Sequence, residues 1–259
     1  MSVRTDVIFN GYSEPSRLDS TSSNGLASLV KIPTNLLSSS RITATGTCTL
    51  VRTYGINILF DTLGPWQAQL LEDTLANNYK LHPDNIDYVV CSHSHADHIG
   101  NLNLFTNAKL HLVGTCPYRE EEYFLDLFEP NGSYSIDISK KNDNNQSTHV
   151  DDQTTTEMVE VITYRDFNIE DNPNIRITPT LGHTLECISM IVDNVDQLGK
   201  VALVGDLFEK EQDLTDDGIW IAAGSKNIDL QRANRKKILS TVDYIVPGHG
   251  PMFKVPSNN

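Results

Sequence analysis

The stretch CSHSHADHIG, residues 91–100, carries the strongest chemical pattern in this 259-residue chain. It holds four ligand-type side chains within six positions, namely His93, His95, Asp97 and His98. Alternate side chains of an extended segment point the same way, so His93 and His95 can both reach one metal ion. If a helix begins after them, Asp97 and His98 project toward a second position nearby. We therefore expect this stretch to supply ligands to two neighbouring metal ions.

Three further ligand-type residues, His183, Asp206 and His249, each directly follow a glycine. Asp206 and His249 also come shortly after apolar runs that are typical of strands. Glycine permits tight turns and close approach of the backbone, and loops at strand ends are where sheet proteins build their sites. We expect these three side chains to meet the 93–98 run and to complete a ligand set for two metals.

Runs rich in β-branched and apolar residues predict strands in both halves of the chain. They cover residues 3–9, 26–32, 41–52, 56–60, 87–92, 110–113, 175–178, 187–192, 201–204 and 244–246. A helix is predicted to start at the Gly-Pro pair 64–65, because proline suits the first helical position. Its expected buried face consists of Trp66, Leu70, Leu71 and Leu75. With a second helix predicted over residues 228–239, the pattern favours a layered α/β fold.

The length of the chain predicts a single domain, residues 1–259, with enough sequence to bury a sizeable core. Residues 134–157 interrupt it, because they contain few apolar side chains and many Asn, Asp, Gln, Ser and Thr. Such a composition is typical of a loop that does not pack into a core. We therefore predict a polar loop insertion over residues 134–157.

The sequence predicts no membrane span, because no apolar run approaches the roughly 18–20 residues that a crossing needs. The N-terminal residues MSVRTD lack the apolar centre of a signal peptide, so we expect a cytoplasmic or nuclear protein. The four cysteines are scattered without a Cys-x-x-Cys pair, which predicts small buried side chains and no disulfide framework. They are Cys48, Cys91, Cys116 and Cys187.

The formal charge of −14 disfavours non-specific binding to nucleic acid or to an anionic membrane. Two bound divalent cations would nevertheless create a positive pocket inside an acidic protein. A local basic run offers another way to contact RNA: it comprises Arg232, Arg235, Lys236 and Lys237, with Lys254 nearby in sequence. The competing interpretation of this run is a solvated helix face.

The ligand pattern resembles the metallo-β-lactamase superfamily, whose metal motif is a His-x-His-x-Asp-His run followed by a His, an Asp and a final His. Every ligand position of that motif is present here. The resemblance implies an αββα sandwich, in which helices flank two mixed β-sheets and the metals lie at one edge. The ligands that it implies are His93, His95 and His183 for the first metal, Asp97, His98 and His249 for the second, and Asp206 as the bridge between them.

Four sequence blocks extend the resemblance to one branch of this superfamily. They are residues 61–66, 97–102, 205–209 and 246–253, whereas residues 134–157 and the N-terminal stretch do not match. The branch implies an endoribonuclease that acts on the 3′ end of replication-dependent histone pre-mRNA. It also implies a homodimer, for which the sequence itself contains no recognisable signal.

The mechanism that we hypothesise uses a hydroxide bridging two divalent metals as the nucleophile. Asp97 is expected to bind a metal and to accept or relay the proton of the attacking water. We expect Asp61 to hold a ligand histidine in one tautomer and Thr184 to do similar work through its hydroxyl, although both positions also suit strand-end caps. A ligand set without thiolate favours Zn²⁺ and leaves Mn²⁺ and Fe²⁺ open. The substrate-binding residues stay unassigned.

Two other functions stay open. A glyoxalase II-like thioester hydrolase (hydroxyacylglutathione hydrolase type) uses the same ligands, but only 10 residues follow His249, where those enzymes place a helical glutathione-binding domain. Only 22 residues separate His183 from Asp206, which leaves no room for the cap of β-CASP nucleases and argues against that class. Asp206 stands where many class B β-lactamases have a cysteine, which argues against a true β-lactamase. The alternative from another class is a metal-binding regulatory protein with little catalysis, which degenerate ligands would favour.

Overall fold

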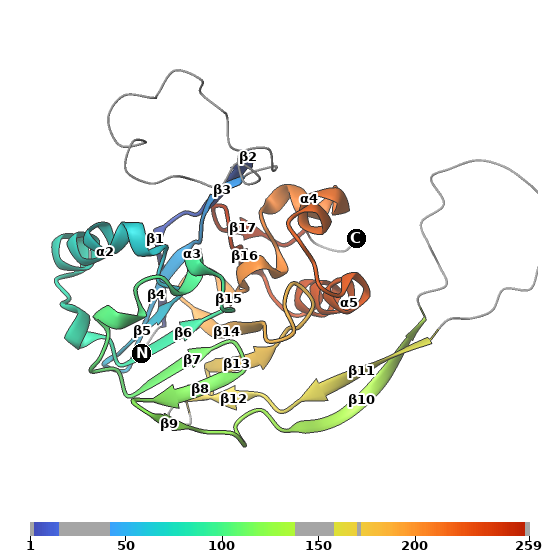
Figure 1. Ribbon diagram of the computed structural model, residues 1–259, viewed down its shortest axis with the longest axis horizontal. Helices are drawn as coiled ribbons and strands as arrows, with labels where there is room; N and C mark the ends of the chain where they lie inside the picture. The colour runs from blue at the N-terminus through green and yellow to red at the C-terminus, as the bar shows by residue number, and fades with distance from the viewer. Residues whose placement is uncertain (1–2, 16–41, 138–157, 170–171, 257–259) are drawn as a thin grey trace, which may run out of the picture.

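Two β-sheets packed face to face, with helices on both outer sides, form the fold of the computed structural model (Figure 1). The structure describes residues 3–15, 42–137, 158–169 and 172–256. Each of the two main sheets contains parallel and antiparallel neighbours. The predicted αββα sandwich of two mixed sheets is therefore confirmed.

The first sheet is mixed. In spatial order it consists of β1 (Arg4–Phe9), β4 (Cys48–Thr53), β5 (Ile56–Phe60), β6 (Tyr88–Cys91), β7 (Leu110–Val113), β8 (Cys116–Arg119) and β9 (Glu122–Tyr123). Strands β5, β6 and β7 run parallel to one another, and the other neighbours are antiparallel. Its three central strands therefore end at the same edge.

The second sheet has one parallel pair. In spatial order it consists of β12 (Phe167–Asn168), β13 (Ile175–Pro179), β14 (Ile188–Val195), β15 (Gly199–Leu203), β16 (Tyr244–Val246) and β17 (Phe253–Lys254). Strands β15 and β16 run parallel. Two hairpins lie outside the main sheets: β2 (Tyr12–Pro15) pairs with β3 (Ile42–Thr45), and β10 (Pro130–Asp137) pairs with β11 (Met158–Tyr164).

The helices lie on opposite outer sides of the sandwich (Figure 1). They are α2 (Ala68–Thr74), α3 (Ala96–Ile99), α4 (Asp217–Ala222) and α5 (Ile228–Leu239). Shorter helical turns span Pro65–Gln67, Leu75–Tyr79, Pro83–Asn85, Leu102–Leu104, Gly205–Leu207 and Glu211–Leu214. Side chains of α2 pack on the first sheet and those of α5 on the second. Within the described part of the chain, no helix combines the length and apolarity that crossing a membrane requires.

Strand alternation divides the core into three apolar layers, because successive side chains of a strand point to opposite faces. In β5, Ile58 packs between the two sheets, whereas Leu59 packs beneath α2. In β15, Leu203 packs between the sheets, whereas Ala202 packs beneath α5. All four side chains are fully buried. Both faces of the central strands are thus covered, which explains their continuous apolar sequences.

The parallel strand pairs bring the chemically active loops to one edge of the sandwich. Because β5 and β6 run parallel, Asp61 follows one strand beside the place where His93 follows the other. In the second sheet, Asp206 and His249 follow the parallel strands β15 and β16 in the same way. The backbone joins these last two loops, since the Gly248 amide donates to the Phe208 carbonyl at 2.9 Å.

Predicted elements with a strong local pattern match the observed bounds. Residues 56–60, 110–113, 228–239 and 244–246 coincide with β5, β7, α5 and β16. The predicted strand 41–52 is instead split into β3 and β4, because the chain bends at Gly46 to donate its amide to the Asp97 carbonyl at 3.1 Å. The predicted strand 26–32 lies outside the described residues.

The predicted polar loop over residues 134–157 is wrong at its start. Residues 134–137 form the end of β10, where Tyr134 lies opposite Val161 and Ile136 opposite Val159 in β11. The average polarity of the segment concealed this strand, although Tyr and Ile at alternate positions are typical of one. Residues 138–157 lie outside the described part of the chain, so the rest of this prediction stays a prediction.

The predicted packing role of Trp66 is also wrong, because its side chain is 64% exposed. A 3-10 turn, Pro65–Gln67, precedes α2, which begins only at Ala68. The helical spacing counted from Trp66 therefore does not hold, and Leu70 is exposed as well. Leu71 and Leu75 are buried as predicted.

The exposure of Trp66 predicts that Trp66→Ala changes the free energy of unfolding by no more than about 0.5 kcal/mol. Trp220, which is fully buried, is the matched control, and Trp220→Ala is expected to cost about 3–5 kcal/mol. Urea denaturation of the two variants and the parent protein, all metal-free, measures both values. Equal losses in the free energy of unfolding would contradict the placement of Trp66 at the surface and of Trp220 in the interior.

Candidate metal centre

The 93–98 run changes conformation in its middle, and this change separates its ligands into two pairs. His93 lies just beyond β6, and His95 is the extended residue that precedes α3, with φ −68° and ψ 145°. Asp97 and His98 lie on α3 itself. The predicted passage from strand end to helix is thus present, and it directs the two pairs toward different positions.

The first ligand group joins three imidazoles and one carboxylate: His93, His95, His183 and Asp206. His93 Nε2 lies 2.8 Å from His95 Nδ1, which lies 3.2 Å from His183 Nε2. Asp206 Oδ2 lies 3.3 Å from His183 Nε2 and 3.6 Å from His93 Nε2. Residues from both sheets therefore meet at one point.

The second ligand group lies on the other side of the same carboxylate. Asp206 Oδ1 is 3.2 Å from His98 Nε2 and 3.3 Å from His249 Nε2. Asp97 Oδ2 lies 3.8 Å from each of these two nitrogens. The structure thus brings together all seven predicted ligands, and the two oxygens of Asp206 face different groups.

Close packing holds Asp206 in this position. A Cβ atom at Gly248 would overlap Asp206 Oδ1, and one at Gly205 would overlap the Ser92 hydroxyl. Gly205 also has a φ of +51°, a conformation that favours glycine. The Asp206 carbonyl accepts a 2.9 Å hydrogen bond from the side-chain amide, Nε2, of Gln231 on α5. The glycines that precede ligands therefore serve close approach, as the sequence predicted.

The ligand atoms fit two divalent metal ions. Zn–N bonds of about 2.0 Å in tetrahedral geometry place ligand atoms about 3.3 Å apart, which is close to the separations seen here. Among the described residues, His98 Nε2 and Asp206 Oδ1 are buried without a hydrogen-bond partner. Two buried polar atoms that face each other without a geometrically satisfied hydrogen bond suit a cation between them.

The electrostatics of the cluster also suit cations. Burial opposes the charge of Asp206, but the imidazoles of His98, His249 and His93 outweigh it and hold its pKa well below the ordinary value. Burial likewise opposes the charge of His98, yet Asp206 and Asp61 raise its pKa well above the usual range. His249, beside Asp206, has its pKa raised to about 9. The carboxylate thus stays ionised and draws positive charge to itself.

His93 behaves in the opposite way. Burial and the neighbouring His98 lower its pKa well below the ordinary value, so its ring is neutral near pH 7. Burial lowers the pKa of His183 in the same direction. A neutral imidazole offers a lone pair to a metal, which is the protonation state that a ligand needs.

Asp61 orients one of the ligand rings. His98 donates its Nδ1–H to Asp61 Oδ2 at 2.8 Å, so the opposite nitrogen, Nε2, turns toward Asp206. The Ser92 amide donates to Asp61 Oδ1 at 2.6 Å and fixes the carboxylate. The Thr45 carbonyl orients the ring of His249 in the same way, because it accepts a hydrogen bond from Nδ1 of that ring at 2.9 Å. Such contacts set the tautomer and direction of a metal-binding histidine.

Thr184, the other residue expected to support a ligand, has its described contacts within its own turn. Its hydroxyl lies 3.0 Å from Cys187 Sγ and accepts from the Glu186 amide at 3.3 Å. These bonds shape the loop that follows His183. Cys187 is buried, which raises the pKa of its thiol to about 12. Cys48 and Cys91 are buried as predicted, whereas Cys116 is exposed, and none forms a disulfide.

The predicted basic run on α5 is wrong for Arg235, which is buried. Its guanidinium donates to the Leu207 carbonyl at 2.7 Å, lies 3.3 Å from Asp213 Oδ2 and stacks over the ring of Phe208. Arg232 is exposed but lies near Asp217 and Asp229, at 3.4 and 3.2 Å. The spacing of charges along the sequence could not show this, because tertiary packing turned Arg235 inward.

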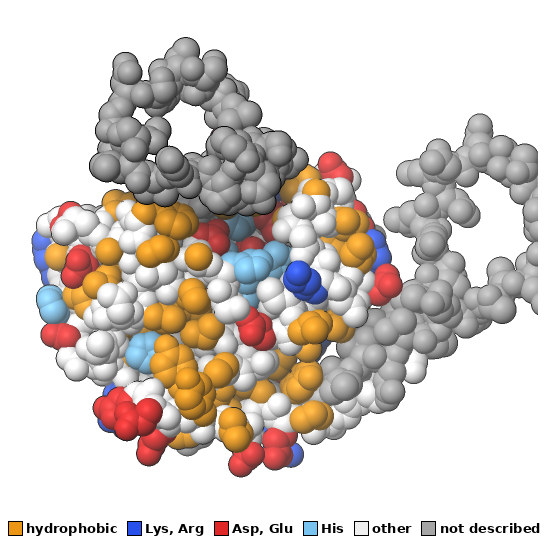
Figure 2. Space-filling model, viewed as in Figure 1, with side chains coloured by type: hydrophobic (Ala, Val, Ile, Leu, Met, Phe, Trp, Pro, Cys, Tyr) orange, Lys and Arg blue, Asp and Glu red, His pale blue; other side chains and the backbone are white. Residues whose placement is uncertain are grey.

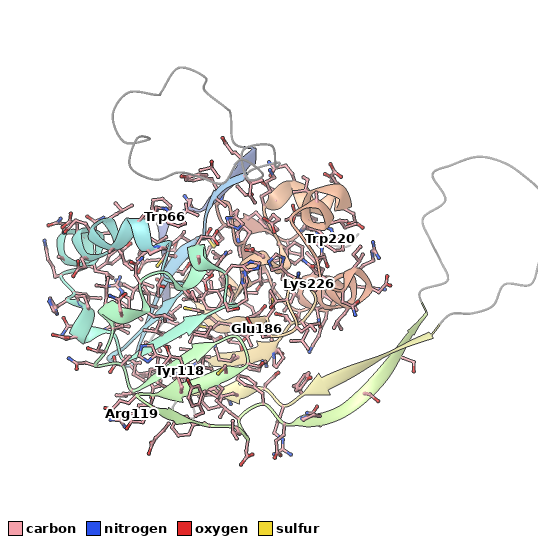
Figure 3. All side chains as sticks on the ribbon, viewed as in Figure 1. Trp66, Tyr118, Arg119, Glu186, Trp220 and Lys226 are labelled. Carbon is pink, nitrogen blue, oxygen red and sulfur yellow. The ribbon has the colours of Figure 1, made fainter. Side chains whose placement is uncertain are left out.

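Two residues at the site escaped the sequence prediction. Glu209 is buried beside Asp206 and His249, with which it forms a third group of ligand atoms. Lys226 lies beside the histidine cluster, where Figure 2 shows a hollow with His and acidic side chains (Figures 2 and 3). Its amide donates to the Gly182 and His183 carbonyls at 2.9 and 3.2 Å. Glu209 lies in the matched sequence block 205–209, which could have singled it out as a candidate, whereas no sequence pattern pointed to Lys226.

Comparisons with known proteins agree with this geometry. A family model described as the metallo-beta-lactamase superfamily matches residues 43–249. A Xenopus laevis protein named metallo-beta-lactamase domain-containing protein 1 is 31% identical over 212 residues, which cover 82% of this chain and 73% of that protein. The Homo sapiens protein of the same name is 29% identical over 255 residues, covering 96% and 81%. The branch that the four sequence blocks resemble is that of the proteins named metallo-beta-lactamase domain-containing protein 1, and this prediction is confirmed.

Solved structures show the same fold. A quorum-quenching N-acyl homoserine lactone lactonase superposes on 96% of this chain and 91% of its own, with a TM-score of 0.53 and 17% identity. At such low identity the likeness shows the fold alone.

The contact between Asp61 and His98 predicts that Asp61→Asn weakens binding of the second metal ion by about 10–100-fold, because His98 loses its fixed orientation. Titration of the metal-free variant with Zn²⁺ against a chromogenic chelator measures the affinity. The matched control is Asp84→Asn, since Asp84 lies 3.0 Å from His82 on the surface, away from the cluster. Two ions bound with unchanged affinity by Asp61→Asn would contradict the orienting role.

Proposed function

This chain belongs to the metallo-β-lactamase superfamily of metal-dependent hydrolases, and on that premise we propose that it hydrolyses phosphodiester bonds in single-stranded RNA with two divalent metal ions. The observation that carries the proposal is the position of Asp206, whose oxygens face His183 on one side and His98 and His249 on the other. By the branch resemblance, the RNA is the 3′ end of histone pre-mRNA. We propose Zn²⁺ for the imidazole-rich first group.

Two divalent ions held by these ligands would supply positive charge to lower the pKa of a bound water and to offset the charge that develops on a phosphate. The chain itself contributes a proton acceptor, because Asp97 differs from Asp206 in its exposure. The side chain of Asp97 is 17% exposed and that of Asp206 is 5% exposed. Asp97 therefore lies at the open side of the cluster, where its carboxylate can take the proton of an attacking water.

The open side of the cluster also has a group suited to an anionic substrate. His95 and Ser94 are exposed there, and Ser94 donates to Glu186 through its amide and its hydroxyl. Lys226 is exposed beside the same opening, and its amide is tied to the loop of His183. A lysine ammonium interacts with a phosphate as a compact point charge. We propose that Lys226 contacts a phosphate of the bound strand.

The exposed ring of Trp66 offers a second kind of contact. It belongs to the turn Pro65–Gln67, which contacts α3, the helix of Asp97 and His98. Figure 3 shows its side chain at the periphery of the molecule. Bases of a single strand stack on exposed aromatic rings without regard to sequence, and each stack contributes about 1–3 kcal/mol. The ring thus supports a single-stranded substrate.

An activity screen tests the proposed reaction. We expect the metal-loaded protein to cleave single-stranded RNA and to leave S-lactoylglutathione and a β-lactam intact. Asp97→Ala should lower kcat/KM for RNA at least about 100-fold, because it removes a ligand and a proton acceptor. Gel analysis of end-labelled RNA and absorbance assays measure the three activities.

The other outcomes of this screen identify the alternatives. Turnover of the thioester with intact RNA would replace the nuclease by a thioester hydrolase. Binding of two metals without turnover of any substrate would indicate a regulatory metal-binding protein.

The position of Lys226 predicts that Lys226→Ala raises KM for RNA about tenfold and changes kcat little, since one charge-assisted contact is lost. Lys226→Arg should keep most of the affinity. The effect should shrink as salt rises, because the contact is exposed. Lys237→Ala is the matched control, as Lys237 is an exposed lysine on α5, away from the ligands. A larger loss in Lys237→Ala than in Lys226→Ala would move the RNA contact to α5.

A further inference from the structure

Glu209 is a buried carboxylate that the superfamily motif does not include. It follows Asp206 by three residues and is only 3% exposed. Its Oε2 lies 3.8 Å from His249 Nε2, the nitrogen that faces Asp206. Its other oxygen, Oε1, is buried and has no hydrogen-bond partner among the described residues. Such an atom in the interior needs an explanation.

The backbone holds Glu209 against the ligand loops from two directions. Its amide donates to Asp213 Oδ2 at 2.6 Å, and its carbonyl accepts from the His249 amide at 2.9 Å. The second bond joins the loop after β15 to the loop after β16. The position of the Glu209 side chain is therefore fixed by the same pairing that fixes His249.

The charge around Glu209 is unbalanced. Its carboxylate neighbour in the ligand group is Asp206, and among the described residues His249 is the imidazole that lies within 4 Å of both acids. The nearby guanidinium of Arg235 is engaged by Asp213 and by the Leu207 carbonyl. Two neighbouring carboxylates in the interior are costly unless a cation lies between them.

We propose that Glu209 is a further carboxylate ligand of the second metal ion, beside Asp206 and His249. The proposal rests on the metal pair of the proposed function and adds a residue to it. The atoms that carry it are Glu209 Oε2, Asp206 Oδ1 and His249 Nε2, since ligand atoms of these three residues lie within 4.8 Å of one another.

The consequence is a difference in metal preference between the two positions. The first group has three imidazoles and one carboxylate, whereas the second would have two imidazoles and three carboxylates, from Asp97, Asp206 and Glu209. Imidazole suits Zn²⁺, and carboxylate oxygens suit harder ions such as Mn²⁺. The second position should therefore accept Mn²⁺ more readily than the first.

The test compares Glu209→Gln with the parent protein. Glutamine keeps the size of the side chain and removes its charge. Metal-free samples receive one equivalent of Zn²⁺ and then a titration of Mn²⁺, followed by elemental analysis and Mn²⁺ paramagnetic resonance. We expect the variant to keep the first ion and to bind the second at least about tenfold more weakly, with the larger loss for Mn²⁺. Glu211→Gln is the matched control, because Glu211 is an exposed carboxylate of the turn Glu211–Leu214 and belongs to none of the ligand groups.

The first ion is an internal control for folding. If Glu209→Gln binds both ions with the affinity of the parent, or if both affinities fall equally, the proposal is overturned. If the parent protein itself binds fewer than two ions, the proposed function fails first, which is a separate result.

Thermal melting gives a second readout. Without metal, Glu209→Gln should melt close to the temperature of the parent, because glutamine keeps the size of the side chain. The rise in Tm on adding metal should be smaller in the variant than in the parent. A merely structural Glu209 would produce the reverse: a lower Tm without metal and an unchanged rise, which would overturn the proposal.

Discussion

Asp206 places a negative charge in the interior between imidazoles of both sheets, and such a charge is stable there only with positive charge around it. Much of the edge of the sandwich serves this requirement. Gly205 and Gly248 let the backbone approach, Gln231 of α5 binds the Asp206 carbonyl, and Asp61 turns His98 toward the carboxylate. The imidazoles that stabilise this charge in the metal-free protein are the same side chains that would bind metal ions, so structural and chemical demands coincide.

The layered α/β class and the ligand residues could be predicted because both depend on local sequence, whereas the αββα arrangement and the division of the ligands between two metals came from the family resemblance. The central strands have continuous apolar sequences, since each of their faces is covered, and ligands placed after strand ends recur at one edge by topology alone. Arg235 and Trp66 were placed wrongly because their exposure depends on elements distant in sequence: the 208–213 segment covers Arg235, and a 3-10 turn redirects Trp66. Glu209 stood in a matched block, but only the pairing of two loops shows that it faces His249.

The proposed RNA substrate rests on the surroundings of the cluster, because the ligands alone do not specify a substrate. The lactonase that superposes here shows the fold without close sequence relation. In this chain the opening carries one lysine near His183 and an exposed serine held by Glu186, whereas the basic side chains of α5 are partly engaged in ion pairs. The proposed phosphate contact is thus confined to a small area beside the cluster.

The ligands come from both halves of the sandwich: His93 to His98 follow a strand of the first sheet, and His183, Asp206 and His249 follow strands of the second. Bound ions would therefore act as a removable cross-link between halves that are distant along the chain. Because the site exists only in the folded chain, the free energy of metal binding adds to the free energy of folding, and unlike a disulfide this contribution is reversible. Metal supply would then govern the cooperativity and protease resistance of the whole domain, as well as its chemistry.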